Sequence, residues 1–127
     1  MNENQTIKET FFGLADEFFS VYMISSKING YCYTSRLFIM GHALELYIKC
    51  ILVDEYKLEY LLTHKIFKYV NEIDSNFSLS SNVINAGKSL FSEETNNFRL
   101  ELFDKHREDL ELYLIYYQSS RSSPVKL

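Results

Sequence analysis

The chain is poor in helix-breaking residues: it has one proline, four glycines and no tryptophan among 127 residues. This scarcity of helix-breaking residues favours long helices. No stretch shows the alternating pattern of a β-strand. No apolar run approaches the roughly 18 residues of a membrane span. The polar start, residues 1–5, lacks the apolar segment of a signal peptide. We therefore expect a cytoplasmic protein without a membrane segment.

Basic charge is also scarce. Thirteen Lys and Arg residues stand against seventeen Asp and Glu residues, which gives a net charge of −4. Proteins that bind nucleic acid draw affinity from clustered basic side chains, so this composition offers no general field for a phosphate backbone. Cys32 and Cys50 lack a metal-binding spacing such as C-x-x-C, and we expect two buried, reduced thiols. The sequence indicates neither a metal nor a cofactor.

Aromatic residues are abundant instead. Ten Phe and ten Tyr make up 16% of the chain, while the hydrophobic fraction of 46% and the charged fraction of 24% are ordinary for a soluble protein. Aromatic packing should therefore dominate the core and any partner surface. The length predicts a single domain, residues 1–118, followed by a flexible serine-rich tail, residues 119–127.

The N-terminal half predicts a helical hairpin. A first helix over 7–27 has a capping-box pattern at Thr6 and Glu9. It carries two adjacent apolar stripes, a wider face than one neighbouring helix covers. The first stripe is Ile7, Phe11, Leu14, Phe18 and Tyr22, and the second is Phe12, Ala15, Phe19 and Met23. A turn at Asn29-Gly30 leads into a second helix over 33–55, which should be the most buried and antiparallel to the first.

The C-terminal half predicts further helices. A short helix over 64–73 begins at an N-cap, Thr63, and a polar loop over 74–82 follows. Another short helix covers 83–91, and the last helix starts between 92 and 95 and runs to 118. Its expected inner stripe is Phe98, Leu102, Leu110, Tyr113, Leu114 and Tyr117. The expected fold class is all-α, an up-and-down bundle of four or five helices.

Three polar residues interrupt the apolar second helix: His42, Glu45 and Lys49. Their spacings of three and four align them on one helical face. They form either a solvent-facing strip with a Glu45–Lys49 ion pair or a small binding site in a groove between helices. One histidine and one carboxylate are too few for a metal site, which generally needs at least three ligands.

The pattern His42-Ala43-x-Glu45-x-x-x-Lys49, after an aromatic-rich helix, resembles the second helix of the HEPN family (higher eukaryotes and prokaryotes nucleotide-binding). The segment 63–70 is similar to the segment that follows in that family, and 121–125 is similar to an Arg-aromatic-Pro ending of some members. The resemblance implies a HEPN-like helical bundle and a homodimer. Many members are metal-independent endoribonucleases of toxin–antitoxin and other defence systems, and others are non-catalytic binding or assembly modules.

The nuclease signature of that family is an Arg, four to six residues and a His near the start of the last long helix, with two protomers building the site. Arg99 and His106 match it, with six residues between them. Seven positions are close to two helical turns, so both share a face. The histidine would act as general acid or base and the arginine would stabilise the phosphate. Leu100, however, stands where a polar residue is expected, and the surrounding helix is acidic.

Arg36 and His42 also fit the permitted spacing, but their side chains diverge by about 120° on a helix. The sequence therefore favours a non-catalytic HEPN-like interaction module, in a prokaryotic defence or toxin–antitoxin setting. Its expected partners are a second copy of the chain and a protein such as a nucleotidyltransferase-like antitoxin. The alternative is a metal-independent endoribonuclease that uses Arg99 and His106 on RNA across a homodimer. A structural helical protein unrelated to the family is the third possibility.

Overall fold

The computed structural model describes residues 3–25, 33–53, 77–118 and 127. These residues contain five α-helices and no β-strand, which confirms the all-α class. The helices are α1 (Glu3–Ser25), α2 (Tyr33–Leu52), α5 (Leu79–Lys88), α6 (Glu93–Lys105) and α7 (Arg107–Gln118). No helix in this part of the chain is both long and apolar enough to cross a membrane. The chain divides into two compact units, Met1–Leu62 and Thr63–Leu127.

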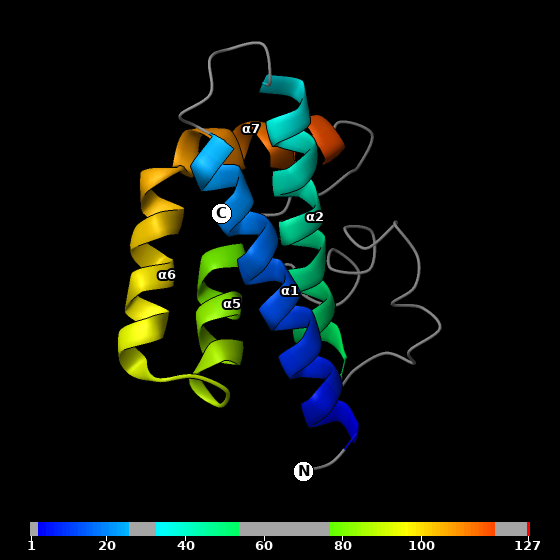
Figure 1. Ribbon diagram of the computed structural model, residues 1–127, viewed down its shortest axis with the longest axis vertical. Coiled ribbons are helices and arrows are strands. Elements are labelled where there is room, and N and C mark those ends of the chain that lie inside the picture. Colours follow the sequence, from blue (N-terminus) through cyan, green and yellow to red (C-terminus); the bar gives the residue numbers. More distant parts are fainter. Residues whose placement is uncertain (1–2, 26–32, 54–76, 119–126) are drawn as a thin grey trace. The chain divides into compact units, whose positions relative to one another are not determined.

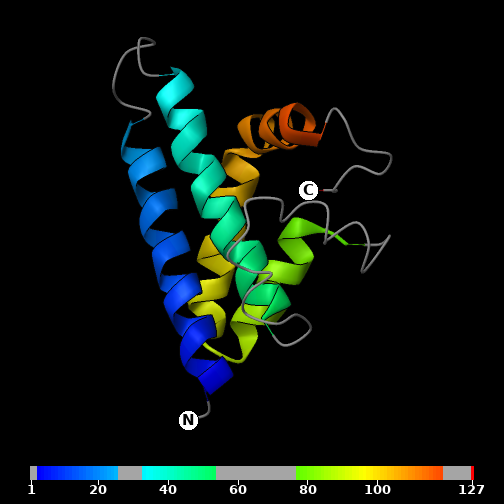
Figure 2. The same cartoon turned by 90° about the vertical axis from the view of Figure 1, so that its right-hand side faces the viewer.

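The first unit contains the predicted antiparallel hairpin, α1 beside α2 (Figures 1 and 2). Both helices contribute large buried side chains: Phe12, Phe19 and Tyr22 from α1, and Met40, Leu44, Tyr47 and Ile48 from α2. The Tyr47 ring packs edge-on against Phe12, with the centroids 5.3 Å apart. Its hydroxyl donates a hydrogen bond of 2.5 Å to Asp16 Oδ1, so the polar end of this buried ring is satisfied.

The start of α1 differs from the expectation. The helix begins at Glu3, and Thr6 lies inside it, where the Thr6 carbonyl accepts a hydrogen bond of 2.9 Å from Thr10 Oγ1. The capping-box prediction at Thr6 is therefore wrong. The α2 helix begins at Tyr33 as predicted. It ends at Leu52 and not at residue 55, and Val53 lies in a turn.

In the second unit, α5 and α6 lie antiparallel and α7 turns away from the axis of α6 (Figures 1 and 2). Helix α5 starts at Leu79, so the prediction of a loop through residue 82 is wrong over 79–82. Ser78 is the extended N-cap residue, and Asn82 Oδ1 accepts a hydrogen bond of 3.0 Å from Ser78 N. The serines and asparagine that suggested a loop instead form the first turn of a helix, where such residues satisfy unpaired backbone groups.

The predicted last helix is broken into two. Helix α6 begins at Glu93, within the predicted range 92–95. Ser92 is its N-cap residue, and its Oγ accepts a hydrogen bond of 3.2 Å from Thr95 N. At His106 the backbone leaves the helical region, with φ −107° and ψ 21°, and α7 begins at the next residue. Leu110, Tyr113 and Leu114 are buried as predicted.

The inner face of α6 is not the predicted one. Phe98 is 60% exposed, whereas the buried residues of α6 are Asn96, Arg99 and Phe103. The buried face is rotated by about one residue from the apolar stripe, about 100° around the axis. Two of these three buried residues, Asn96 and Arg99, are polar and are hydrogen-bonded to each other. A prediction from apolar periodicity cannot identify a buried face of this kind.

Other predictions fall outside the described residues: the 64–73 helix with its cap Thr63, the position of Cys32, and a flexible tail over 119–126. Leu127 itself is held, because its carbonyl oxygen accepts hydrogen bonds from Ser78 Oγ (3.0 Å) and Ser80 N (2.9 Å). The single domain over 1–118 stays a prediction.

Candidate functional site

The polar strip on α2 is split between two environments. Glu45 and Lys49 form the expected ion pair, with Lys49 Nζ 3.8 Å from Glu45 Oε2. Their side chains are only 13% and 9% exposed, respectively, so the pair is largely withdrawn from solvent. A solvent-facing strip is thus wrong for these two residues, and their charges are largely committed to each other.

His42 leaves the strip and joins an aromatic cluster. Its ring stacks on Phe18 of α1, with centroids 5.6 Å apart and an interplanar angle of 26°. Phe38, one helical turn earlier on α2, meets the same ring edge-on at 4.6 Å and 79°. His42 therefore bridges the two helices through ring contacts, and sequence reasoning did not bring these three side chains together.

The cluster continues along α1. Leu14 and Val21 lie one turn before and one turn after Phe18 on the same helical face. We call Leu14, Phe18, Val21, Phe38 and His42 the aromatic seam. The four apolar members are 41%, 36%, 49% and 61% exposed, in that order. Of the two apolar stripes predicted on this helix, the structure buries Phe12, Ala15 and Phe19 of one, whereas Leu14 and Phe18 of the other are exposed.

The second candidate site contains Arg99. This residue is 3% exposed, and its Nη1 donates a hydrogen bond of 2.6 Å to Asn96 Oδ1, one turn earlier. The guanidinium carbon lies 5.1 Å from the centre of the Phe91 ring, a cation–π contact. A buried cation is costly unless it is paired and hydrogen-bonded, and these contacts provide that compensation.

Gly87 of α5 makes this arrangement possible. A Cβ at Gly87 would lie 2.3 Å from Asn96 Oδ1 and 3.3 Å from Arg99 Nη1. Glycine is therefore required by the close approach of α6 and not by its backbone angles, because the described residues include no glycine with positive φ. A glycine inside a predicted helix was the one sequence signal that could have located this contact.

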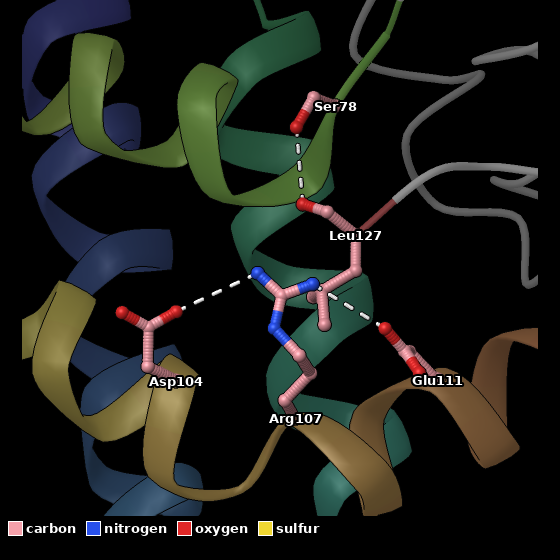
Figure 3. Close-up of polar contacts among 5 residues, drawn as sticks. All are labelled: Ser78, Asp104, Arg107, Glu111 and Leu127. Atoms are coloured by element: carbon pink, nitrogen blue, oxygen red, sulfur yellow. Dashed lines mark hydrogen bonds and ion pairs between the residues drawn. The ribbon is translucent and has the colours of Figure 1, made fainter.

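His106 lies at the joint between α6 and α7. It is the C-cap residue of α6, and its backbone N–H donates to the Leu102 carbonyl. Beside it, Arg107 makes ion pairs with Asp104 of α6 (3.6 Å) and Glu111 of α7 (3.3 Å) (Figure 3). Those three side chains are at least half exposed, so the pairs orient the joint more than they stabilise it.

Arg99 and His106 thus differ in environment. They are about 10 Å apart along the helix direction. Arg99 is packed against α5, whereas His106 is half-buried at the end of α6. The outer side of α6 is acidic: an open hollow beside it is lined, among the described residues, by Glu93, Glu94, Thr95, Asn97, Phe98 and Glu101.

The Arg36–His42 pair diverges as expected. Arg36 Nε donates a hydrogen bond of 3.0 Å to Ser25 Oγ, and its guanidinium lies 4.6 Å from the centre of the Tyr22 ring. His42 faces the seam. The Cys50 thiol is buried, with its Sγ 3.5 Å from the Lys8 carbonyl oxygen.

Among residues 3–25, 33–53 and 77–118, no three His, Cys, Asp or Glu side chains are grouped so that they could hold a metal ion. Comparison with known proteins finds no matching family model, no similar curated protein and no similar solved structure. The function of the chain therefore has to be inferred from the geometry of its two candidate sites.

Proposed function

We propose that this chain is a non-catalytic, HEPN-like interaction module that works with a partner protein in a prokaryotic defence or toxin–antitoxin setting. One observation carries the proposal. The arginine that would have to bind phosphate, Arg99, is 3% exposed and its guanidinium is hydrogen-bonded to Asn96 and stacked over Phe91. A group engaged in this way serves the packing of α5 against α6.

The charge around α6 supports the same proposal. Residues with side chains on its outer side include Glu93, Glu94 and Glu101. An RNA strand approaching this helix would meet carboxylates first, and like charges lower both the rate and the strength of association. The exposed aromatic seam, in contrast, presents apolar area of the kind that protein interfaces use. Homodimerisation and binding of a nucleotidyltransferase-like protein are the partner interactions that we propose for the module.

The alternative function is a metal-independent endoribonuclease. The position of His106 favours it, because this half-buried imidazole lies at a helix end beside an exposed arginine, Arg107. A histidine there could transfer a proton if a second protomer supplied a phosphate-binding group. The nuclease function requires either that Arg99 break its hydrogen bond to Asn96 or that a different arginine bind the phosphate.

An RNA cleavage assay separates the two functions. The purified chain is incubated with labelled single-stranded RNA in EDTA, beside the His106→Ala variant as the control. Our proposal expects both proteins to leave the RNA at the level of buffer alone. Cleavage by the native chain that His106→Ala removes, with unchanged circular dichroism, would establish the nuclease and refute the proposal.

A further inference from the structure

The aromatic seam has the geometry of a helix-binding surface. Leu14, Phe18 and Val21 follow one another at i, i+4 and i+7 on α1, and Phe38 and His42 form a second row at i and i+4 on α2. These are the spacings at which an amphipathic helix offers its own apolar anchors. The α1 row extends about 10 Å, which matches two turns of a bound helix.

Among the described residues of the hairpin, the exposed charge beside the seam is acidic. The exposed charged side chains of α1 are Glu3, Glu9 and Glu17, all acidic. Of these, Glu17 directly precedes Phe18 and lies beside the seam, whereas Glu9 lies on the opposite side of α1. Glu45 follows His42 by one turn, but it is largely buried and paired with Lys49. The basic residues of the described hairpin are withdrawn: Lys49 is buried with Glu45, Arg36 is turned to Ser25 and Tyr22, and Lys8 is half-buried.

This charge distribution selects between occupants. A second copy of the chain would bring the same exposed carboxylate, Glu17, to the seam, in a protein whose net charge is already −4. Like charges facing each other oppose association, whereas opposite charges steer it and fix its register. We infer that the aromatic seam docks a cationic amphipathic helix of a partner protein, with apolar side chains on Phe18 and Phe38 and Lys or Arg beside Glu17.

The inference rests on the proposed interaction function and names its surface and the chemistry of its partner. The probe is a fluorescent helical peptide of leucine and lysine, with leucines at i, i+3, i+4 and i+7. A matched peptide carries glutamate in place of lysine. Fluorescence anisotropy with the full chain should show the glutamate peptide binding at least about tenfold more weakly, because its charges repel Glu17 and the net negative charge of the protein.

Two matched pairs of variants locate the binding. Phe38→Ser should weaken binding of the lysine peptide about tenfold, since truncating a central interface aromatic removes more than about 1 kcal/mol. Ile115→Ser on α7, where the side chain is 67% exposed against 61% for Phe38, should leave binding unchanged. Glu17→Lys should weaken binding of the lysine peptide severalfold. Glu9→Lys makes the same charge change on the side of α1 opposite the seam and should leave this binding unchanged.

Equal binding of both peptides, or equal effects within either pair of variants, would overturn the inference. So would a homodimer in sedimentation that Phe38→Ser dissociates and Ile115→Ser does not, because the seam would then belong to a second copy. Those outcomes leave the interaction module itself standing. Only RNA cleavage that depends on His106 overturns the proposed function, and that assay does not involve the seam.

Discussion

Replacing Gly87 by alanine tests whether the packing of Arg99 governs the second unit. Helix propensity alone predicts stabilisation, because alanine is favoured over an interior glycine by about 1 kcal/mol. The structure predicts instead that Gly87→Ala destabilises the protein. The added Cβ would lie 2.3 Å from Asn96 Oδ1, and that oxygen is held by Arg99 in a side chain only 2% exposed.

The magnitude follows from the two ways to relieve this overlap. If Asn96 stays, overpacking costs about 1–3 kcal/mol. If it swings away, the chain loses a hydrogen bond to a charged group, worth about 1.5–3 kcal/mol. After the gain in helix propensity of about 1 kcal/mol, Gly87→Ala should lower the free energy of unfolding by up to about 2 kcal/mol.

Gly13→Ala is the matched control. Gly13 lies inside α1, and nothing lies within 4 Å of its added Cβ, so this variant should gain up to about 1 kcal/mol. Urea unfolding of the full chain, followed by far-ultraviolet circular dichroism, measures both. In an Asn96→Ala background, where the overlap with Asn96 is removed, Gly87→Ala should raise the free energy of unfolding as helix propensity predicts. Equal stabilisation by Gly87→Ala and Gly13→Ala would refute the argument.

Three further predictions use the same unfolding assay. Leu44→Ala should cost about 2–5 kcal/mol, because Leu44 is fully buried on α2; a loss below 1 kcal/mol would contradict its place in the core. Glu45→Gln should cost about 1–3 kcal/mol by leaving the 7% exposed Lys49 without its partner charge, and Lys49→Met in that background should recover part of the loss. Ser92→Ala should cost about 1 kcal/mol and Ser92→Gly a few tenths, since glycine also favours an N-cap; equal losses would argue against the side-chain cap.

Much of the fold could be predicted from local sequence patterns. The sequence predicted the antiparallel hairpin, the start of α2 at Tyr33 and a helix start between 92 and 95, because apolar periodicity and helix-start residues act within a few positions of the chain. The break at His106 was not, since the residues on both sides favour helix and Arg107 bridges the joint with charges that fit an unbroken helix equally well.

The sites were harder to predict for a different reason. Sequence periodicity shows that Phe18 and Phe19 are both apolar, but only the position of α2 decides that Phe19 is buried while Phe18 stacks on His42. Likewise, Arg99 is a polar residue that a pattern assigns to the surface. Its burial depends on Asn96 one turn away and on a glycine from another helix, and no local pattern contains that combination.

The exchange of the Arg99 guanidinium hydrogens with solvent tests most directly whether this residue serves the fold. Nitrogen-15 NMR of the arginine side chains can follow it with and without single-stranded RNA. The account predicts slow exchange for Arg99 and fast exchange for Arg107, whose side chain is 51% exposed, and no change of the Arg99 signal when RNA is added. Exchange at Arg99 as fast as at Arg107, or a shift of its signal on adding RNA, would contradict the account.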